Sequence, residues 1–316
     1  MTAASTAPSV GDNAPEVIVY GTVCLDQFLR VDAGGSPLSE PFEMPGGEAF
    51  NTAVVLAGWG VRVLLTGTAL GSDRESDRLR ALLDDPVVGL SRRRVPDLPN
   101  AVTPVCTVRV FPDGERMMQG RGYRDALAPP PLPDTDFAAC PVFAVDPNLG
   151  TPATEAALRA ASRGCPVVAM DFQQVPEVVR AACLVQTSRE GLARFPLPRL
   201  TNPEPEEAAR HLAAMGARIA IVTDGARGGA AAVREGDRIV VQRYASTPVP
   251  KVLDTTGAGD VFRAGLCWGL LPERGGCPLP RLLRIASAAA ALHCQTLGGG
   301  SRPPLEAVLR LAETPA

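Results

Sequence analysis

Lysine is almost absent from this sequence. Lys251 is the only lysine among 31 basic residues, and arginine supplies the rest. A Walker-type phosphate loop and a protein-kinase site each require a lysine within a fixed motif, and neither motif is present. These two classes of nucleotide site are therefore excluded. The net charge of −3 also argues against a protein that binds nucleic acid by neutralising its phosphates.

Histidine, paired cysteines and long apolar runs are scarce as well. The two histidines lie far apart and none of the eight cysteines forms a C-x-x-C pair, so we expect no zinc cluster. The cysteines are interpreted as small buried side chains in a reducing compartment. Residues 1–15 lack the charged and apolar regions of a signal peptide and are predicted to be a disordered lead. Because no apolar run is long enough to cross a bilayer, we predict a cytoplasmic protein that does not contact a membrane.

Apolar residues are abundant, and their spacing indicates the fold class. Strand-like runs alternate with segments of helical spacing, which is typical of an α/β fold whose mostly parallel sheet is covered on both faces. No repeat or linker interrupts this order, so residues 16–316 are predicted to form one domain. Strands are predicted over 16–20, 27–31, 61–65, 142–145, 166–170 and 219–222, and helices over 48–56, 74–83, 154–162 and 202–216, the last with Asn202 as N-cap and Pro203 as its first residue.

One segment departs from the β/α alternation. Residues 102–120 alternate in polarity around a turn at 112–115, which predicts a hairpin. A hairpin that stands off an α/β body suits a lid, and we expect a β lid built from about 27–45 and 100–122. Its exposed strand edges also suggest pairing of two chains, which predicts a homodimer through the lid.

The stretch 252–262 carries the strongest chemical signal. An apolar strand end runs into a turn with Gly257 and Gly259 and then into an apolar helix. Backbone amides at such a turn, together with the positive end of the helix, can hold an anion without a lysine. Asp260 lies in the first helical turn, where a carboxylate can accept a proton from an attacking hydroxyl. From these residues alone, a plain strand-to-helix turn with Asp260 stabilising the helix start stays open.

The full string from Asp254 to Asp260, followed by Val-Phe-Arg-Ala-Gly, resembles the C-terminal signature of the ribokinase-like (PfkB) carbohydrate kinases. The resemblance extends from residue 17 to about 303. It implies a three-layer ribokinase-like α/β fold with a mostly parallel central sheet and a small β lid. It also implies that Asp260 is the catalytic base, that the amides of Gly257, Ala258 and Gly259 form the anion hole, and that Asp254 helps to order a monovalent cation or a water.

A second set of residues resembles the acceptor side of this family. Gly46, Gly47 and Asn51 match its Gly-Gly-x-x-x-Asn segment, and an asparagine, as donor and acceptor, suits a sugar diol. Asp26 stands where the family has a substrate-binding aspartate after its first strand. Three further candidates complete the predicted acceptor site: Asp146 at a strand end, and Arg121 and Arg124 after the hairpin, which would favour an acidic or phosphorylated acceptor.

The nucleotide side resembles the family less completely. Thr223, Gly225 and Gly228 match its Thr-x-Gly-x-x-Gly loop, which lines ATP. The family's Asn-x-x-Glu motif corresponds to residues 187–190, so Glu190 is retained, with Mg²⁺ bound through water, while Thr187 replaces the asparagine. That replacement puts the details of metal and phosphate binding in doubt, but not the class of reaction.

The resemblance as a whole implies an ATP-dependent phosphotransferase that acts on a hydroxyl of a small sugar-like acceptor. ATP and Mg²⁺ are the implied cofactors, and activation by K⁺ stays open. Two alternatives remain. A nucleoside kinase of the same superfamily would share every motif, and a catalytically silent ligand-binding relative would explain the missing asparagine at position 187. Kinases of vitamin-type substrates are less consistent with the sequence, because they usually lack the lid and the Gly-Gly-x-x-x-Asn segment.

Overall fold

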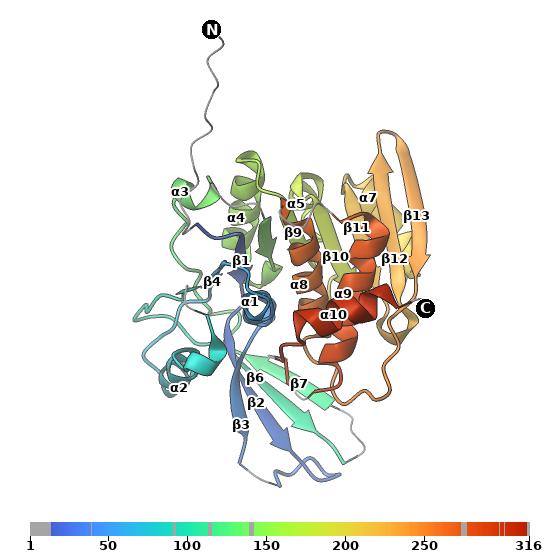
Figure 1. The fold of residues 1–316 in the computed structure, drawn as a ribbon. Coiled ribbons are helices and arrows are strands. Elements are labelled where there is room, and N and C mark those ends of the chain that lie inside the picture. The colour runs from blue at the N-terminus through green and yellow to red at the C-terminus, as the bar shows by residue number, and fades with distance from the viewer. Residues whose placement is uncertain are drawn as a thin grey trace.

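A computed structural model describes residues 14–38, 40–90, 93–112, 116–138, 142–272, 277–296, 298–299 and 301–314. Its body is built on a nine-stranded sheet of order β13-β12-β11-β10-β9-β8-β1-β4-β5 (Figure 1). All neighbours from β5 to β11 pair in parallel, and the last two strands are antiparallel. The strands are β1 (Val17–Gly21), β4 (Val63–Gly67), β5 (Arg93–Arg94), β8 (Val142–Val145), β9 (Val167–Met170), β10 (Leu184–Ser188), β11 (Ile219–Thr223), β12 (Gly229–Glu235) and β13 (Arg238–Tyr244).

Helices cover both faces of this sheet. Successive residues of β1 point to opposite faces, so Val17 and Val19 join one apolar cluster and Ile18 and Tyr20 join the other. Strands buried on both faces are typical of parallel sheets. One cluster includes residues of α1 (Glu48–Gly58), α2 (Arg74–Leu83), α8 (Ala258–Leu270), α9 (Leu279–His293) and α10 (Leu305–Glu313), and the other includes residues of α3 (Asp134–Phe137), α4 (Thr151–Ser162), α5 (Pro176–Ala181), α6 (Arg189–Arg194) and α7 (Pro205–Ala214).

A smaller sheet of four strands forms the lid below this body (Figure 1). Its order is β3-β2-β6-β7, with strands β2 (Cys24–Arg30), β3 (Phe42–Gly46), β6 (Val105–Val110) and β7 (Arg116–Arg121). The predicted hairpin is confirmed, because β6 and β7 pair in antiparallel register. The central pair β2 and β6 is parallel, so the lid sheet is mixed.

The predicted α/β fold with a mostly parallel sheet is confirmed, and so are the predicted strands and helices, apart from shifts at their ends. One helix start is wrong: α7 begins at Pro205 with Glu204 as N-cap, whereas Asn202 has a φ of 47° outside the helix. The cause is the second proline, because a proline disfavours helical backbone at the residue before it. A helix that began at Pro203 would need Glu204 in that conformation.

Two predictions concern the start of the chain and its relation to membranes. The predicted disordered lead falls, except for residues 14 and 15, outside the described residues. None of the helices in the described ranges is both long and apolar enough to cross a membrane.

Candidate active site

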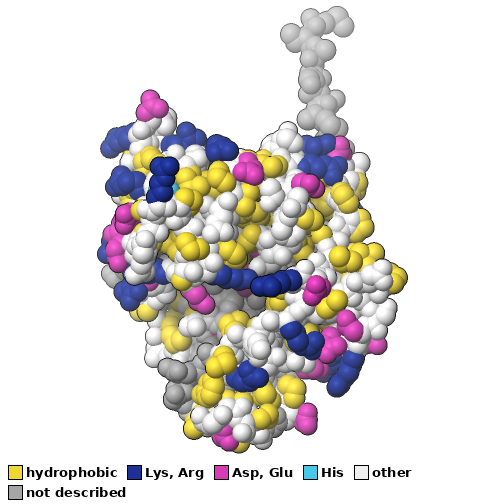
Figure 2. Space-filling model, turned by 180° about the vertical axis from the view of Figure 1, so that it is seen from behind, with side chains coloured by type: hydrophobic (Ala, Val, Ile, Leu, Met, Phe, Trp, Pro, Cys, Tyr) yellow, Lys and Arg dark blue, Asp and Glu magenta, His cyan; other side chains and the backbone are white. Residues whose placement is uncertain are grey.

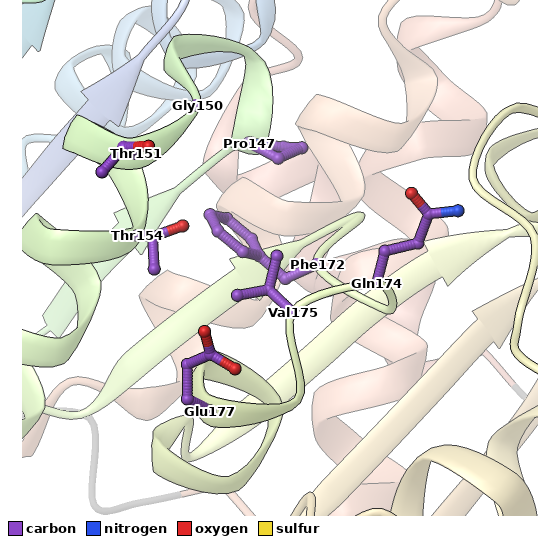
Figure 3. A pocket seen from close by; sticks show the side chains of 8 residues that line it. All are labelled: Pro147, Gly150, Thr151, Thr154, Phe172, Gln174, Val175 and Glu177. Atoms are coloured by element: carbon purple, nitrogen blue, oxygen red, sulfur yellow. The ribbon is translucent and has the colours of Figure 1, made fainter.

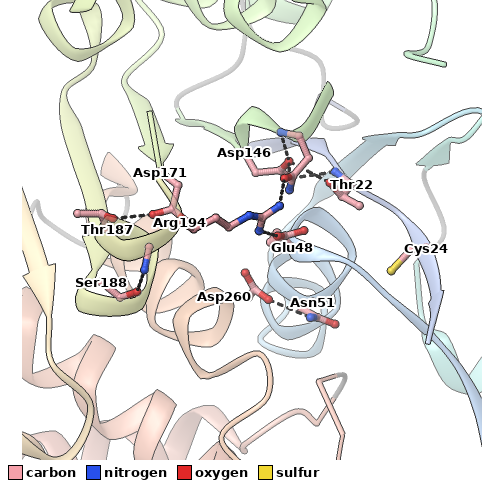
Figure 4. Close-up of polar contacts among 12 residues, drawn as sticks. Thr22, Cys24, Glu48, Asn51, Asp146, Asp171, Thr187, Ser188, Arg194 and Asp260 are labelled. Atoms are coloured by element: carbon pink, nitrogen blue, oxygen red, sulfur yellow. Dashed lines mark hydrogen bonds and ion pairs between the residues drawn. The ribbon is translucent and has the colours of Figure 1, made fainter. Parts of the chain in front are cut away.

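Asp260 lies where two helices from opposite ends of the chain meet. It occupies the first turn of α8 and is 6% exposed. The Asn51 side chain on α1 donates from Nδ2 to its Oδ2 at 2.9 Å (Figure 4), and Thr52 donates from Oγ1 to its backbone carbonyl at 3.2 Å. Two residues predicted for the same site, 209 positions apart in sequence, are therefore in direct contact.

Neighbouring groups shift the pKa of Asp260 in opposite directions. Burial raises the pKa of its carboxyl well above the usual value, and the Glu48 carboxylate raises it further. The guanidinium of Arg263, with Nη2 at 4.0 Å from Asp260 Oδ1, and the hydrogen bond from Asn51 lower this pKa. The site thus holds a buried carboxylate whose protonation depends on one neighbouring cation.

The turn before α8 is held from several sides. Gly257 adopts a φ of 79° as the N-cap of the helix, a backbone conformation that favours glycine. The Asp254 carboxylate accepts the amide N–H of Thr256 at 2.7 Å and that of Gly298 at 2.8 Å. On α9, His293 Nε2 lies 2.7 Å from the carbonyl oxygen of Thr256. The loop is therefore fixed in one shape.

The three amides predicted as an anion hole differ in their surroundings. The amide of Ala258 donates to the carbonyl of Thr255 at 3.1 Å. Within the described part of the chain, the amides of Gly257 and Gly259 have no such acceptor. A Cβ on Gly259 would meet no atom within 4 Å, so there is open space on the side-chain side of this residue. Its carbonyl accepts a hydrogen bond from Gln186 Nε2 on β10 at 2.9 Å, which orients the peptide.

The predicted acceptor segment forms the junction between lid and body. A Cβ on Gly47, whose φ is 98°, would lie 2.4 Å from the Thr22 carbonyl oxygen, and a Cβ on Gly46 would lie 2.0 Å from Asp26 Oδ2. Position 47 therefore requires glycine, whereas a larger residue at position 46 would displace the Asp26 side chain. Asp26 on β2 is 6% exposed and accepts a hydrogen bond from the Cys24 thiol at 3.2 Å. Burial raises its pKa to about 7.

Asp146 follows β8 and is completely buried. It accepts from the amide and the hydroxyl of Thr22, at 2.9 and 3.1 Å, and from the amide and side chain of Asn148, at 3.2 and 3.1 Å. Burial, with help from the Glu48 carboxylate, raises its pKa to about 6. Asp146 thus ties the end of β8 to the loop that follows β1, and its predicted contact with the acceptor stays a prediction.

The two arginines predicted near the acceptor lie at the edge of the lid. Arg121 forms an ion pair with Glu75 at 2.7 Å, and Arg124 is exposed. The structure therefore does not bring either guanidinium together with Asp260.

The predicted nucleotide loop follows β11. Gly225 and Gly228 have positive φ values of 54° and 80°, and a Cβ on Gly228 would lie 2.1 Å from the Tyr244 carbonyl oxygen. Thr223 ends β11, with its hydroxyl 3.5 Å from the Thr187 carbonyl oxygen on the adjacent strand. The two nucleotide segments predicted from the sequence are therefore neighbours at the carboxyl edge of the sheet, where α/β proteins bind ligands.

Thr187, which replaces the family asparagine, has a partner that the sequence analysis missed. Its hydroxyl donates to Asp171 Oδ1 at 2.6 Å. Asp171 follows β9 with a φ of 59°, which is unusual for a residue other than glycine. Glu190 is exposed in the first turn of α6. Such a carboxylate fits Mg²⁺, because that ion usually takes one or two protein carboxylates and completes its shell with water and phosphate oxygens.

Two arginines and a glutamate complete the cleft, and the sequence analysis did not single them out. Arg194 at the end of α6 reaches across to Asn148, at 3.0 Å, and to Glu48, at 3.9 Å (Figure 4). Arg263 is completely buried within α8. A signal for Arg263 was present, because it interrupts an otherwise apolar helix after Asp260.

A pocket on the described part of the chain contains none of the predicted site residues. It has a volume of about 430 Å³ and lies between the start of α4 and the segment after β9 (Figure 3). Its lining consists of Pro147, Gly150, Thr151, Thr154, Phe172, Gln174, Val175 and Glu177.

Comparison with protein families assigns this arrangement. The model of the pfkB family carbohydrate kinases matches residues 14–306, which is nearly the whole chain. The chain belongs to this family. The resemblance inferred from its motifs is thereby confirmed.

Two curated relatives share short stretches with this pfkB-family kinase. An acarbose 7(IV)-phosphotransferase from an Actinoplanes strain is 42% identical over 79 residues, which are 25% of each chain. An uncharacterised sugar kinase from Dictyostelium discoideum is 49% identical over 57 residues, which are 18% of this chain and 16% of that protein. The kinase thus matches a quarter or less of the length of these two relatives.

Solved structures agree over nearly the full length of the kinase. Ribokinase from Arabidopsis thaliana, complexed with ribose and ATP, has a TM-score of 0.75 at 22% identity and covers 96% of this chain and 100% of its own. A nucleoside kinase from Burkholderia thailandensis, in complex with inosine, has a TM-score of 0.70 at 19% identity and covers 93% and 95%. The ribokinase-like fold with a small lid sheet is therefore confirmed.

Proposed function

We propose that this kinase transfers the γ-phosphoryl group of ATP to a hydroxyl of a small, neutral, sugar-like acceptor. The observation that carries this proposal is the contact of Asp260 with Asn51 beside the amides of Gly257 and Gly259. The proposed base at the start of α8 then contacts the proposed acceptor-binding amide on α1, and the proposed anion-binding N–H groups directly precede the base in the sequence. This is the set of groups that phosphoryl transfer to an alcohol requires.

The proposed reaction starts with the acceptor between the lid and the body. Asp26 and Asn51 bind its hydroxyls and direct one of them to Asp260. As the hydroxyl oxygen attacks the γ-phosphorus, its proton passes to the Asp260 carboxylate, and the bond from phosphorus to the leaving ADP oxygen breaks. The amides of Gly257 and Gly259 stabilise the charge on the transferred group. A raised pKa of Asp260 suits this step, because a general base works best with a pKa near the working pH.

The nucleotide would lie along the carboxyl edge of β10 and β11, against Thr223, Gly225 and Gly228. Glu190 would hold Mg²⁺ through water, and the ion would neutralise charge on the ATP phosphates. The Thr187 hydroxyl is engaged with Asp171, so in this chain it fixes that carboxylate and is proposed to act on the phosphates only through it.

Asp254 is proposed first as a loop anchor. Each of its carboxylate oxygens accepts one backbone N–H, which supports a role in shaping the turn before α8. Whether a monovalent cation also binds there stays a prediction, which comparison of initial rates in K⁺ and in tetramethylammonium salts tests directly.

The charges of the cleft favour a neutral acceptor over an acidic one. The carboxyl groups here are those of Asp26, Glu48, Asp146 and Asp260. The Arg121 guanidinium is already paired with Glu75. Carboxylates accept hydrogen bonds from hydroxyls but repel phosphate and carboxylate groups. We therefore do not retain the earlier expectation of an acidic acceptor in this proposal.

The test is acceptor-dependent ADP release, coupled to NADH oxidation, with Mg-ATP and a panel of pentoses, ketohexoses, sugar acids, sugar phosphates and nucleosides. Asp260→Asn should lower kcat by about 10²–10⁴-fold on the best acceptor, because it keeps the shape of the side chain but cannot accept the proton. Asp237→Asn, at an exposed aspartate in the turn between β12 and β13, is the matched control.

Each outcome of this assay has a distinct meaning. A neutral sugar as best acceptor supports the proposal, whereas a nucleoside would assign the kinase to the nucleoside subclass. A sugar phosphate as best acceptor would contradict the charge argument. Full activity of Asp260→Asn would refute the role of the base. Binding of ATP and of a panel sugar without turnover would favour the catalytically silent alternative.

We also propose that two copies pair through the inner faces of their lids. Phe28 pairs in register with Phe42 and with Val108, and Val108 pairs with Met118, so the four side chains form one row across the sheet on the same face as Asp26. Phe42 is 69% and Met118 is 58% exposed. Figure 2 shows hydrophobic side chains on the lid, at the bottom of the view. A second lid would cover the exposed members of this row, Phe42 and Met118.

A further inference from the structure

Arg263 is a fully buried cation at the centre of the candidate active site. It lies in α8, one turn after Asp260, and its side chain has no exposed surface. Its Nε donates to Thr52 Oγ1 at 2.9 Å, and its Nη2 donates to the Glu48 carbonyl oxygen at 2.5 Å. The guanidinium thereby joins the second turn of α8 to the first turn of α1.

These hydrogen bonds leave the charge of Arg263 uncompensated. Both acceptors are neutral, and Nη1 has no hydrogen-bond partner among the described residues. A buried charge is costly unless an opposite charge lies near it. The nearest carboxylate is that of Asp260, at 4.0 Å, and within the described ranges this is the ion pair that Arg263 makes.

Other charged groups face the same space from the neighbouring elements. Glu48 lies at the start of α1, Asp146 follows β8 and Asp171 follows β9, and the Arg263 guanidinium lowers the pKa of the last two as well as that of Asp260. Arg194 also faces this space, but it is more than half exposed and pairs with Glu48. Arg263 is thus the buried counter-charge shared by the two buried carboxylates of Asp146 and Asp260 and by the partly buried carboxylate of Asp171.

We propose that Arg263 is a positioning residue for phosphoryl transfer, whose guanidinium keeps the Asp260 carboxylate ionised and joins the start of α1 to that of α8. This inference rests on the proposed role of Asp260 as the base. A proton acceptor must be deprotonated before the acceptor hydroxyl arrives, and burial alone opposes that state. Arg263 offsets this effect without occupying either oxygen of Asp260, since its nearest nitrogen is 4.0 Å away.

The test separates the charge of Arg263 from its hydrogen bonds. Arg263→Met removes the charge and keeps a long apolar stem, whereas Arg263→Lys keeps the charge but cannot reach both Thr52 and Glu48. The carboxyl carbons of ¹³C-labelled aspartates are followed by NMR against pH in the unliganded protein, so no acceptor is needed. Asp260→Asn assigns the Asp260 resonance by its loss.

In the Met variant, the Asp260 titration should move to higher pH by about 1–3 units, the range expected for the loss of an opposite charge at this distance. The Lys variant should show no comparable shift, even if it melts at a lower temperature. Should the Met variant fail to fold, Arg263→Gln removes the same charge. An unmoved Asp260 titration in the neutral variant would overturn the proposal and leave Arg263 as a structural clamp.

Activity assays then separate this inference from the proposed function. In kcat/KM for the best acceptor of the panel, the acidic limb of the pH profile should move upward in the neutral variant by the same interval as the NMR titration. A clamp alone would lower the rate at every pH without moving that limb. If Asp260→Asn keeps full activity while the titration still shifts, the assignment of the base has failed, although the charge coupling has not.

Discussion

His293 provides a sharp test of how the loop before α8 is held. Its imidazole is completely buried on α9, with Nε2 facing the carbonyl of Thr256 and Nδ1 facing the hydroxyl of Ser301. Because a carbonyl can only accept, Nε2 carries the proton and Nδ1 accepts from Ser301. The substitution His293→Leu removes both hydrogen bonds and leaves a side chain of similar size.

The expected loss follows from these two bonds. Each contributes about 0.5–1.5 kcal/mol, and leaving a buried polar group without its partner costs about 1–3 kcal/mol, so the variant should lose about 2–4 kcal/mol of unfolding free energy. Urea denaturation followed by fluorescence measures this loss. His211→Leu is the matched control, since His211 is the other histidine and is only partly buried near the end of α7.

The same variant should also affect catalysis more than binding. Thr256 directly precedes Gly257, so a displaced loop would move the amides proposed to bind the anion, while the residues on α1 and β2 proposed to bind the acceptor stay in place. We expect kcat to fall and KM for the acceptor to change little. Ordinary surface substitutions change the unfolding free energy by up to about 0.5 kcal/mol. If the unfolding free energy of His293→Leu differs from that of the parent by no more than this, and kcat is unchanged, the reasoning about this loop is refuted.

Three further predictions follow from the acceptor side and the lid. Gly47→Ala should cost about 1–3 kcal/mol of unfolding free energy and raise KM for the acceptor, because of its φ of 98° and the close Thr22 carbonyl; unchanged urea midpoint and KM would contradict it. Burial holds the pKa of Asp26 at about 7, above its unfolded value, so its contribution to stability is lost as the pH rises through that value. Asp26→Asn should therefore flatten the fall in unfolding free energy between about pH 4 and 7, and an unchanged slope would count against it. Phe42→Glu with Met118→Glu should convert a dimer into a monomer in light scattering, whereas a parent protein that is monomeric at micromolar concentration would remove the basis for the lid interface.

Local sequence patterns predicted helices and strands well where neighbouring residues determine the element. The helix over 74–83 has the predicted bounds, since Asp73 caps its start and its apolar residues lie on one face. The hairpin of β6 and β7 was also expected from alternation around a turn. The start of α7 was not, because the local N-cap pattern at Asn202 was overruled by the second proline, and both signals act within four residues.

The glycine and aspartate motifs of the site could be predicted from the sequence, but the roles of the buried residues that contact them could not. Glycine and aspartate patterns identify the turn at 257–260 because its backbone conformation restricts the residues that fit. His293 carries no such pattern, and Arg263 is marked only as the charged residue that interrupts an otherwise apolar helix. The contact of Arg263 with Thr52 spans 211 positions, and the contact of His293 with Thr256 spans 37, so their partners become apparent only in the folded chain. Asp171 was missed for the same reason, since its partner lies on the next strand.

The balance of charge in the cleft leads to one last inference about selectivity. Arg263 cannot serve an acidic acceptor, because its two hydrogen bonds hold it to the backbone of Glu48 and the hydroxyl of Thr52 and it has no exposed surface. The more exposed guanidinium near this site is that of Arg194, and it pairs with Glu48. An anionic acceptor would have to displace that pair and then lie beside Asp26 and Asp260, whereas a neutral polyol needs only the acceptor oxygens these residues already present. The carboxylates proposed to bind hydroxyls would thereby reject phosphorylated product, which would favour its release after transfer.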